Sequence, residues 1–184
     1  DYLGLATDAL IEIGLTANRV DAASHIGVAR DLYAYLKHNN IPCKLNIPDV
    51  SAFAEGEGEA IPVEVAAVDG APRYTGTTIK GVKVAASPEW LHKKLLAIGL
   101  RPINNIVDIT NFVLHEIGQP LHAFDAAKIQ GGKVVVRRAE EGEKFVTLDG
   151  VERTLSAADL MIANAEKSMC LAGVFGGEES GAPE

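Results

Sequence analysis

Residues Asn105–Asp125 read Asn-Ile-Val-Asp-Ile-Thr-Asn-Phe-Val-Leu-His-Glu-Ile-Gly-Gln-Pro-Leu-His-Ala-Phe-Asp, and this stretch decides the fold around it. Its apolar side chains follow one another at spacings of three and four, at Ile106, Ile109, Val113 and Ile117. That spacing places all four on one face of an α-helix. Gly118 is a typical C-terminal cap and Pro120 cannot continue a helix. The sequence therefore predicts a helix that ends at a polar loop.

Polar side chains of this helix and loop are the first candidates for a site. Thr110 lies inside the apolar stripe, so its hydroxyl needs a partner, which is either a ligand or the carbonyl of Ile106. Asn111 lies about 100° further around the helix and faces either a site or solvent. His122, three residues before Asp125, could hold a water near a reacting ester or serve the structure alone.

Two further helices are predicted around this segment. Asp21–His38 has helical spacing and is ended by Asn39, Asn40 and Pro42. Ser87, Pro88 and Glu89 form a helix start, with Ser87 as the N-cap, and this helix runs to about Ile98, where Gly99 caps it. Asp108 is expected to cap or to orient its neighbours, and we leave it out of the site.

Strands are predicted where β-branched residues gather or alternate with polar ones. These ranges are 62–65, 73–84, 133–138, 145–148, 160–163 and 169–172, and residues Ile47–Ala60 form a surface connector. Because helices and strands cluster instead of alternating regularly, we expect an α+β fold. Its architecture is a layered sandwich of sheet and helices, with mixed or antiparallel strands and about three helices.

Composition narrows the class of protein. The 184 residues, 47% of them hydrophobic, suffice for one well-buried domain. The net charge of -8 disfavours a broad RNA-binding surface, so only the end of an RNA would be bound. We find no signal sequence and no apolar span of about 20 residues, which favours a reducing cytoplasm. Cys43 and Cys170 are expected to be reduced, with a disulfide as the alternative.

An anion site and a metal site have weaker support in the sequence. Gly173–Gly181 is rich in glycine and could cradle an anion, but it lacks the Lys-Ser/Thr ending of a phosphate loop and also fits a tight turn. His122 and Asp125 resemble metal ligands, yet no Cys or His partner stands at a matching spacing. We therefore expect no metal site.

The segment from Val107 to Asp125 resembles the central editing module of the bacterial phenylalanyl-tRNA synthetase beta subunit. The matching motifs are Val-Asp-Ile-Thr-Asn at 107–111 and Gly-Gln-Pro-Leu-His-Ala-Phe-Asp at 118–125. The resemblance extends to 13–21, 27–31 and the glycine-rich turn at 171–177, with Ala17 where the family usually has proline. It implies a single editing-type domain over 1–184, excised from a longer subunit, with an acidic site residue beyond Glu184.

The resemblance also implies a function and a set of site residues. The implied reaction is hydrolysis of tyrosine mistakenly esterified to the tRNA for phenylalanine, by water and without metal or cofactor. ATP and magnesium belong to the parent enzyme, whose beta subunit pairs with an alpha subunit in an alpha2-beta2 assembly. The implied residues are His122 and Asn111 for catalysis, and Thr110, Pro120, Ala123, Ala172 and Gly173 for binding the 3' end of the tRNA and its amino acid. The alternative is a non-catalytic domain that binds an aminoacyl group or a partner protein.

Overall fold

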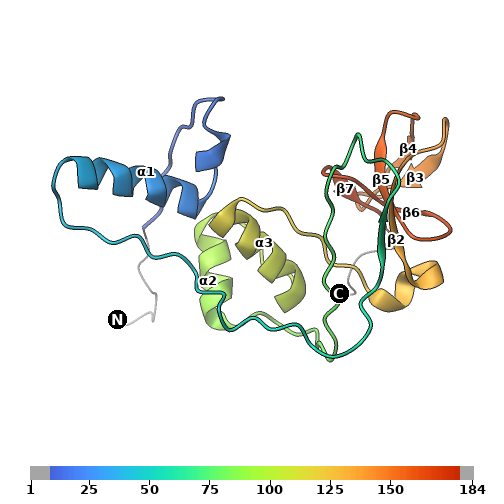
Figure 1. Cartoon of the computed structure of the whole chain (residues 1–184), viewed down its shortest axis with the longest axis horizontal. Coiled ribbons are helices and arrows are strands. Elements are labelled where there is room, and N and C mark those ends of the chain that lie inside the picture. The colour runs from blue at the N-terminus through green and yellow to red at the C-terminus, as the bar shows by residue number, and fades with distance from the viewer. Residues whose placement is uncertain (1–8, 179–184) are drawn as a thin grey trace. The chain divides into compact units, whose positions relative to one another are not determined.

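The computed structural model describes residues 9–178, and its contacts divide the chain into two compact units (Figure 1). The helical unit comprises Asp1–Glu55 and Val84–Leu121, and the sheet unit comprises Gly56–Lys83 and His122–Glu184. Among residues 9–178, the helical unit holds three α-helices, while the sheet unit holds a mixed five-stranded sheet and a two-stranded one. This confirms the α+β class.

Helix α1 spans His25–His38 and begins later than its apolar pattern predicts. Ser24 caps it, because its Oγ accepts a hydrogen bond from the Gly27 N–H at 3.0 Å. The short 3-10 helix η1, Val20–Ala22, precedes this cap and packs against Gly27. The helix ends at His38, as predicted.

Helix α2 spans Glu89–Ala97, but its N-cap differs from the prediction. Pro88 occupies the cap position and no side chain caps the helix. The prediction of Ser87 as N-cap is wrong, because its hydroxyl donates instead to the carboxylate of Asp108 in the next helix. Leu91 and Leu95 are buried, four residues apart on one face of the helix.

Helix α3 spans Asn105–Ile117 and confirms the prediction from the deciding stretch. The buried Asn104 caps its first turn by accepting from the N–H groups of Ile106 and Val107, each at 3.0 Å. Gly118 caps its end in the left-handed conformation with φ of 79°. Both ends of the helix are therefore fixed by local hydrogen bonds.

The sheet unit is built from seven strands within the described residues. The larger sheet has the order β1-β2-β5-β6-β7, in which β1 is parallel to β2 and every other pair is antiparallel. These strands are β1 Val63–Val65, β2 Val134–Arg138, β5 Leu160–Ala163, β6 Ser168–Leu171 and β7 Phe175–Gly176. The smaller sheet pairs β3 Lys144–Val146 with β4 Glu152–Thr154, and the 3-10 helices η2 Ala126–Lys128 and η3 Gln130–Gly132 precede β2.

The predicted strand at 73–84 is wrong, because this segment contains no strand. Its Thr and Val content favours extended backbone, but a strand also needs a partner with which to exchange backbone hydrogen bonds. Here Thr78 instead accepts from the Ile61 N–H through its side-chain Oγ1, at 3.0 Å. Ile47–Ala60 likewise contains no helix or strand, and its role as a connector stays a prediction.

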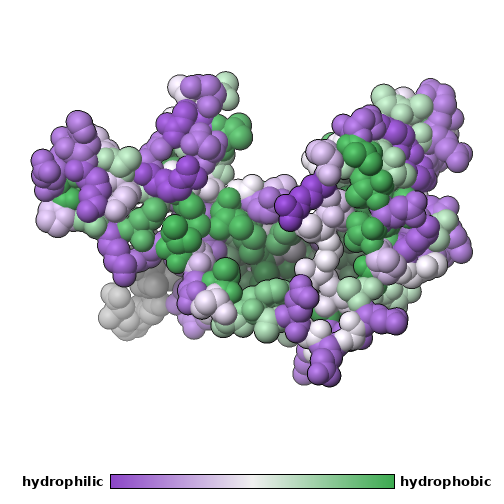
Figure 2. Space-filling view, viewed as in Figure 1, coloured by the Kyte–Doolittle hydropathy of each residue, from purple (hydrophilic) through white to green (hydrophobic). Residues whose placement is uncertain are grey.

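Most of the buried apolar side chains lie in the sheet unit. One cluster joins Ile129, Val134, Ile162, Met169 and Cys170, and the other joins Ala139, Phe145, Leu155 and Met161. The helical unit leaves apolar side chains exposed on all three helices, among them Leu32, Trp90 and Ile109, and apolar surface is visible in Figure 2. No helix in residues 9–178 has the length and apolar character needed to cross a membrane.

Candidate functional site

Thr110 and Asn111 lie in the middle of α3. The Thr110 hydroxyl donates to the Val107 carbonyl at 2.7 Å, so it bonds back to its own helix, one residue away from the expected Ile106. Asn111 is half-buried, and its side-chain amide makes no hydrogen bond to any residue that the structure describes. Of the two, Asn111 is thus the side chain with hydrogen-bonding capacity to offer a ligand.

Asp108 has a structural role in α3, as expected. Its side chain is fully buried and accepts from the Ser87 hydroxyl and, at 2.9 Å, from the Ile103 N–H. Two hydrogen bonds between Ala85 and Asn105 tie the same two segments together, at 2.8 and 3.1 Å. Asp108 therefore holds the segment before α2 against the start of α3.

His122 lies against the glycine-rich turn of the sheet unit. A Cβ built on Gly176 would lie 2.8 Å from His122 Cε1 and 2.8 Å from Leu148 Cδ1. Gly176 is buried and its φ is not positive, so contact alone excludes a side chain there. On another side, the His122 ring tilts against Phe124 with 4.5 Å between ring centroids. These contacts fix where the imidazole lies.

The surroundings of His122 favour its neutral form. The residue is exposed overall, yet the neighbouring atoms desolvate its ring enough to lower its pKa below the usual 6.5. Asp125 does not pair with it; its carboxylate caps η2 by accepting from the Ala127 N–H at 3.0 Å. The ring nitrogens have no hydrogen-bond partner among residues 9–178 and can therefore bind water or substrate.

The glycine-rich turn is a tight turn between β6 and β7. The backbone N–H groups of Ala172, Val174, Gly177 and Glu178 donate to carbonyl oxygens of the chain, at 2.8 to 3.2 Å. These four N–H groups are therefore occupied and do not serve an anion; residues 179–181 lie outside the described range. Gly173 has a φ of +73° and is exposed, while Ala172 packs half-buried against the apolar cluster of β6.

The predicted site residues are divided between the two units. The helical unit carries Thr110, Asn111 and the exposed Pro120. The sheet unit carries His122, Ala123, Ala172 and Gly173, with Ala123 half-buried. Convergence of all seven on one substrate stays a prediction.

Sequence reasoning missed Gly176 and Leu148, which lie beside His122. Gly176 stands in the glycine-rich motif, but nothing local distinguishes it from Gly173. Leu148 directly precedes the Asp149-Gly150 turn, and its side chain is 54% exposed. An apolar side chain that stays exposed beside a histidine and a buried glycine is suited to contact a ligand.

Neither cysteine resembles a nucleophile or a metal ligand. Both are free, and burial raises the pKa of Cys170 to about 11, which keeps it a thiol. Its Sγ donates to the Phe175 carbonyl at 3.3 Å. Within residues 9–178, no three His, Cys, Asp or Glu side chains come together as metal ligands would.

Comparison with known proteins identifies relatives over the whole chain. The sequence model of the B3/4 domain family matches residues 70–184. The chain is 57% identical, over its full length, to the phenylalanine–tRNA ligase beta subunit of Bacteroides fragilis and 54% identical to that of Bacteroides thetaiotaomicron. The beta subunit of Geobacter metallireducens is 49% identical over 98% of the chain. The chain spans 23% of the length of the two Bacteroides relatives and 22% of the third.

Proposed function

The chain belongs to the B3/4 domain family, and on that premise we propose that it is an editing module of phenylalanine–tRNA ligase. The module hydrolyses the ester that joins tyrosine to the tRNA for phenylalanine. Its relatives are beta subunits of that ligase, which supports the choice of substrate. A synthetase pocket that cannot fully reject a near-isosteric amino acid gains selectivity from a second, hydrolytic pocket.

The observation that carries this proposal is the placement of His122. Its ring is fixed between Gly176 and Phe124 and is kept neutral by desolvation, and its nitrogens have no partner among the described residues. A neutral imidazole can accept a hydrogen bond from water at one nitrogen and donate at the other. His122 is therefore suited to orient the attacking water next to an ester carbonyl.

The proposed reaction needs no covalent intermediate on the protein. Water attacks the ester carbonyl, the bond from the carbonyl carbon to the ribose oxygen breaks, and a proton passes to that oxygen. Asn111, whose amide has unused hydrogen-bonding capacity, orients the aminoacyl group together with Thr110. The buried thiol of Cys170 takes no part.

Selectivity for tyrosine follows from the phenolic hydroxyl. A pocket that hydrogen-bonds this hydroxyl rejects phenylalanine, because each buried polar group left without a partner costs about 1–3 kcal/mol. Pro120, Ala123, Ala172 and Gly173 then set the shape around the substrate. Leu148 adds an exposed apolar contact beside His122.

The proposal also places the chain in an assembly. The two units would act as one editing domain of a beta subunit that pairs with an alpha subunit in an alpha2-beta2 enzyme. ATP and magnesium serve amino-acid activation elsewhere in that enzyme. The substrate is the 3' end of the charged tRNA, and the place of action is the cytoplasm.

The test is release of tyrosine from tyrosyl-tRNA by the purified chain and its variants. His122→Ala and Asn111→Ala should each lower the rate at least tenfold and leave the thermal unfolding temperature within a few degrees. His38→Ala, at the far end of α1, is the matched control and should match the unchanged chain. Equal rates for all variants would exclude His122 and Asn111 from catalysis. Binding of tyrosyl-adenosine without hydrolysis would favour the alternative of a non-catalytic aminoacyl-binding domain.

A further inference from the structure

Tyr74 carries a phenolic hydroxyl that the described part of the fold does not use. The residue lies in the segment that follows β1, in the same sheet unit as His122. Its side chain is half-buried, yet its Oη has no hydrogen-bond partner among residues 9–178. The Oη also reaches solvent, because Asn164 Nδ2 is the one fully buried polar side-chain atom without a partner in that range. A half-buried tyrosine normally has a partner for its hydroxyl, so Tyr74 is suited to contact a ligand.

Tyr74 lies on the face of the sheet that holds His122. It packs against the buried cluster that contains Ile162 and Cys170. Cys170 pairs with Ile162 on one side and with Gly176 on the other, and paired residues of neighbouring strands point to the same face. Gly176 is the residue whose missing side chain leaves room for His122. The cluster beside Tyr74 and the imidazole therefore share one face.

Phe124 connects the two groups on this face. Its ring tilts against His122 with 4.5 Å between ring centroids, and it packs against the same cluster as Tyr74. Ala172, which is expected to shape the substrate site, packs there as well. Tyr74 and His122 thus flank one apolar floor. A few polar groups above an apolar floor are typical of a site for a small organic group.

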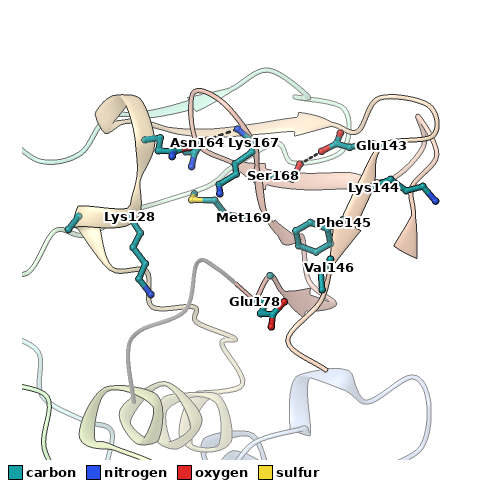
Figure 3. A pocket seen from close by; sticks show the side chains of 13 residues that line it. Lys128, Glu143, Lys144, Phe145, Val146, Asn164, Lys167, Ser168, Met169 and Glu178 are labelled. Carbon is teal, nitrogen blue, oxygen red and sulfur yellow. Dashed lines mark hydrogen bonds between the residues drawn. The ribbon is translucent and has the colours of Figure 1, made fainter. Parts of the chain in front are cut away.

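The opposite face of β7 carries neither group. Successive residues of a strand face opposite sides, and a Cβ on Gly177 would lie 2.9 Å from the Phe145 ring. Phe145 and Gly177 line an open pocket of about 550 Å³, shown in Figure 3, and neither His122 nor Tyr74 lines it. The surface between Tyr74 and His122 is therefore separate from that pocket.

The surroundings keep the hydroxyl of Tyr74 protonated. Burial, with a smaller contribution from the nearby Cys170, raises the pKa of Tyr74 above its usual 10. Tyr74 is therefore a neutral phenol near pH 7 and can donate a hydrogen bond.

Other donors close to this face are already occupied. The Cys170 thiol donates to the Phe175 carbonyl at 3.3 Å, and the N–H groups of Ala172 and Val174 donate to carbonyl oxygens at 2.8 and 3.0 Å. Ester hydrolysis needs a donor for the negative charge that develops on the carbonyl oxygen. The hydroxyl of Tyr74 is available for that role.

We propose that Tyr74 is a further catalytic residue of the ester hydrolysis, and that its O–H donates to the carbonyl oxygen of the ester. The inference rests on the proposed function, to which it adds the group that stabilises the oxyanion. Tyr74 keeps its proton throughout the reaction.

The charge that Tyr74 stabilises appears and disappears within one hydrolysis. When the water oxygen attacks the carbonyl carbon, an electron pair of the carbonyl moves to its oxygen, which then accepts the hydrogen bond more strongly. The pair re-forms the carbonyl as the bond to the ribose oxygen breaks. One proton of the water passes to that ribose oxygen, and the other is lost to solvent from the carboxylic acid that is released.

The test is Tyr74→Phe, which removes only the hydroxyl oxygen. Because the hydrogen bond strengthens as charge develops, kcat for release of tyrosine from tyrosyl-tRNA should fall about tenfold to a hundredfold, while KM changes by less than about twofold. The unfolding temperature should not fall, because the hydroxyl has no partner among residues 9–178. Tyr35→Phe, at an exposed tyrosine of α1, is the matched control and should keep both kcat and KM.

Two analogues that do not react provide a readout independent of turnover. The amide 3'-tyrosylamino-3'-deoxyadenosine keeps a neutral carbonyl, whereas a phosphonate in place of that carbonyl carries negative oxygens as the transition state does. Tyr74→Phe should bind the amide within about twofold of the unchanged chain and the phosphonate at least about tenfold more weakly. A hydroxyl with a structural role alone would affect both analogues equally.

The possible failures are distinguishable. An unchanged kcat in Tyr74→Phe, or equal effects on the two analogues, would overturn the role of Tyr74 and leave the proposed function intact. A similar loss of kcat in Tyr35→Phe would also overturn it, because the effect would not be specific to this site. No ester hydrolysis by the unchanged chain would contradict the proposed function and this inference with it.

Discussion

The imidazole of His122 occupies the space that Gly176 leaves by having no side chain. A Cβ on Gly176 would lie 2.8 Å from His122 Cε1, closer than real Cβ contacts come. The histidine is thus positioned by a glycine more than fifty residues away in sequence. Strand β7 and the loop that carries His122 therefore contact each other at Gly176.

Gly176→Ala should displace His122 without unfolding the chain. The backbone at Gly176 accepts alanine, so the added methyl group acts through contact with His122 and Leu148. We expect at least a tenfold loss of tyrosyl-ester hydrolysis and a stability cost of about 1–3 kcal/mol. Gly56→Ala is the control, because a Cβ there meets nothing within 4 Å. Full activity of Gly176→Ala would show that the position of His122 is unimportant.

The lowered pKa of His122 predicts how stability changes with pH. The folded state disfavours the imidazolium, so the unfolded state binds more protons at pH values just below the usual 6.5. The free energy of unfolding should therefore fall as the pH falls through 6.5 toward the lower pKa of the folded chain, and be flat above 6.5. His122→Gln should remove this part of the pH dependence, measured by urea unfolding against pH. An identical slope in both proteins would contradict the desolvation of His122.

Glu143 should make the chain sensitive to acid. Burial alone would raise its pKa, but hydrogen bonds from Arg137, Ser168 and the Glu140 N–H outweigh burial and lower the pKa from 4.5 to about 2. Its ionised carboxylate therefore adds roughly 3 kcal/mol to the free energy of unfolding. This stabilisation is present above pH 4.5 and is lost as the pH falls toward 2.

Glu143→Gln tests this contribution, because the amide cannot titrate. Its free energy of unfolding should change less between pH 4.5 and 2 than that of the unchanged chain. Glu152→Gln, which removes an exposed ion pair with Lys144, should leave the acid transition where it was. The same acid transition in Glu143→Gln and in the unchanged chain would contradict the stabilising role of the hydrogen bonds to Glu143.

The Ser87–Asp108 contact should stabilise the helical unit. Asp108→Ala leaves the Ser87 hydroxyl and the Ile103 N–H without their acceptor, at a cost of about 2–4 kcal/mol. A double-mutant cycle with Ser87→Ala should give a coupling above about 0.5 kcal/mol. Asp49→Ala, at an exposed turn, is the control and should cost little. Strictly additive effects would mean that the two side chains do not interact.

The sequence predicted correctly those helices and strands whose apolar pattern and end signals lie within one short stretch. Helix α3 has its apolar spacing and its glycine cap within one stretch, and β5 was predicted with its observed bounds, Leu160–Ala163. The failures depend on partners far along the chain. Ser87 caps no helix because Asp108 takes its hydroxyl. Residues 73–84 form no strand, and the Ile61 N–H donates to the Thr78 side chain and not to a backbone carbonyl.

The candidate site was predictable in part. His122 could be singled out because it follows a capped helix within a motif, but its neighbour Gly176 becomes visible only when β7 is folded beside it.

The most direct test of the editing proposal compares tyrosine and phenylalanine on the same tRNA. Tyrosyl-tRNA and phenylalanyl-tRNA, both made with the tRNA for phenylalanine, are incubated with the chain in excess, and the first-order rate of amino-acid release is measured for each. We predict release of tyrosine above the rate in buffer and faster than release of phenylalanine, because polar groups of the pocket lose a hydrogen-bond partner when the phenolic hydroxyl is absent. Equal rates for the two esters, or no release above the rate in buffer, would contradict the proposed function.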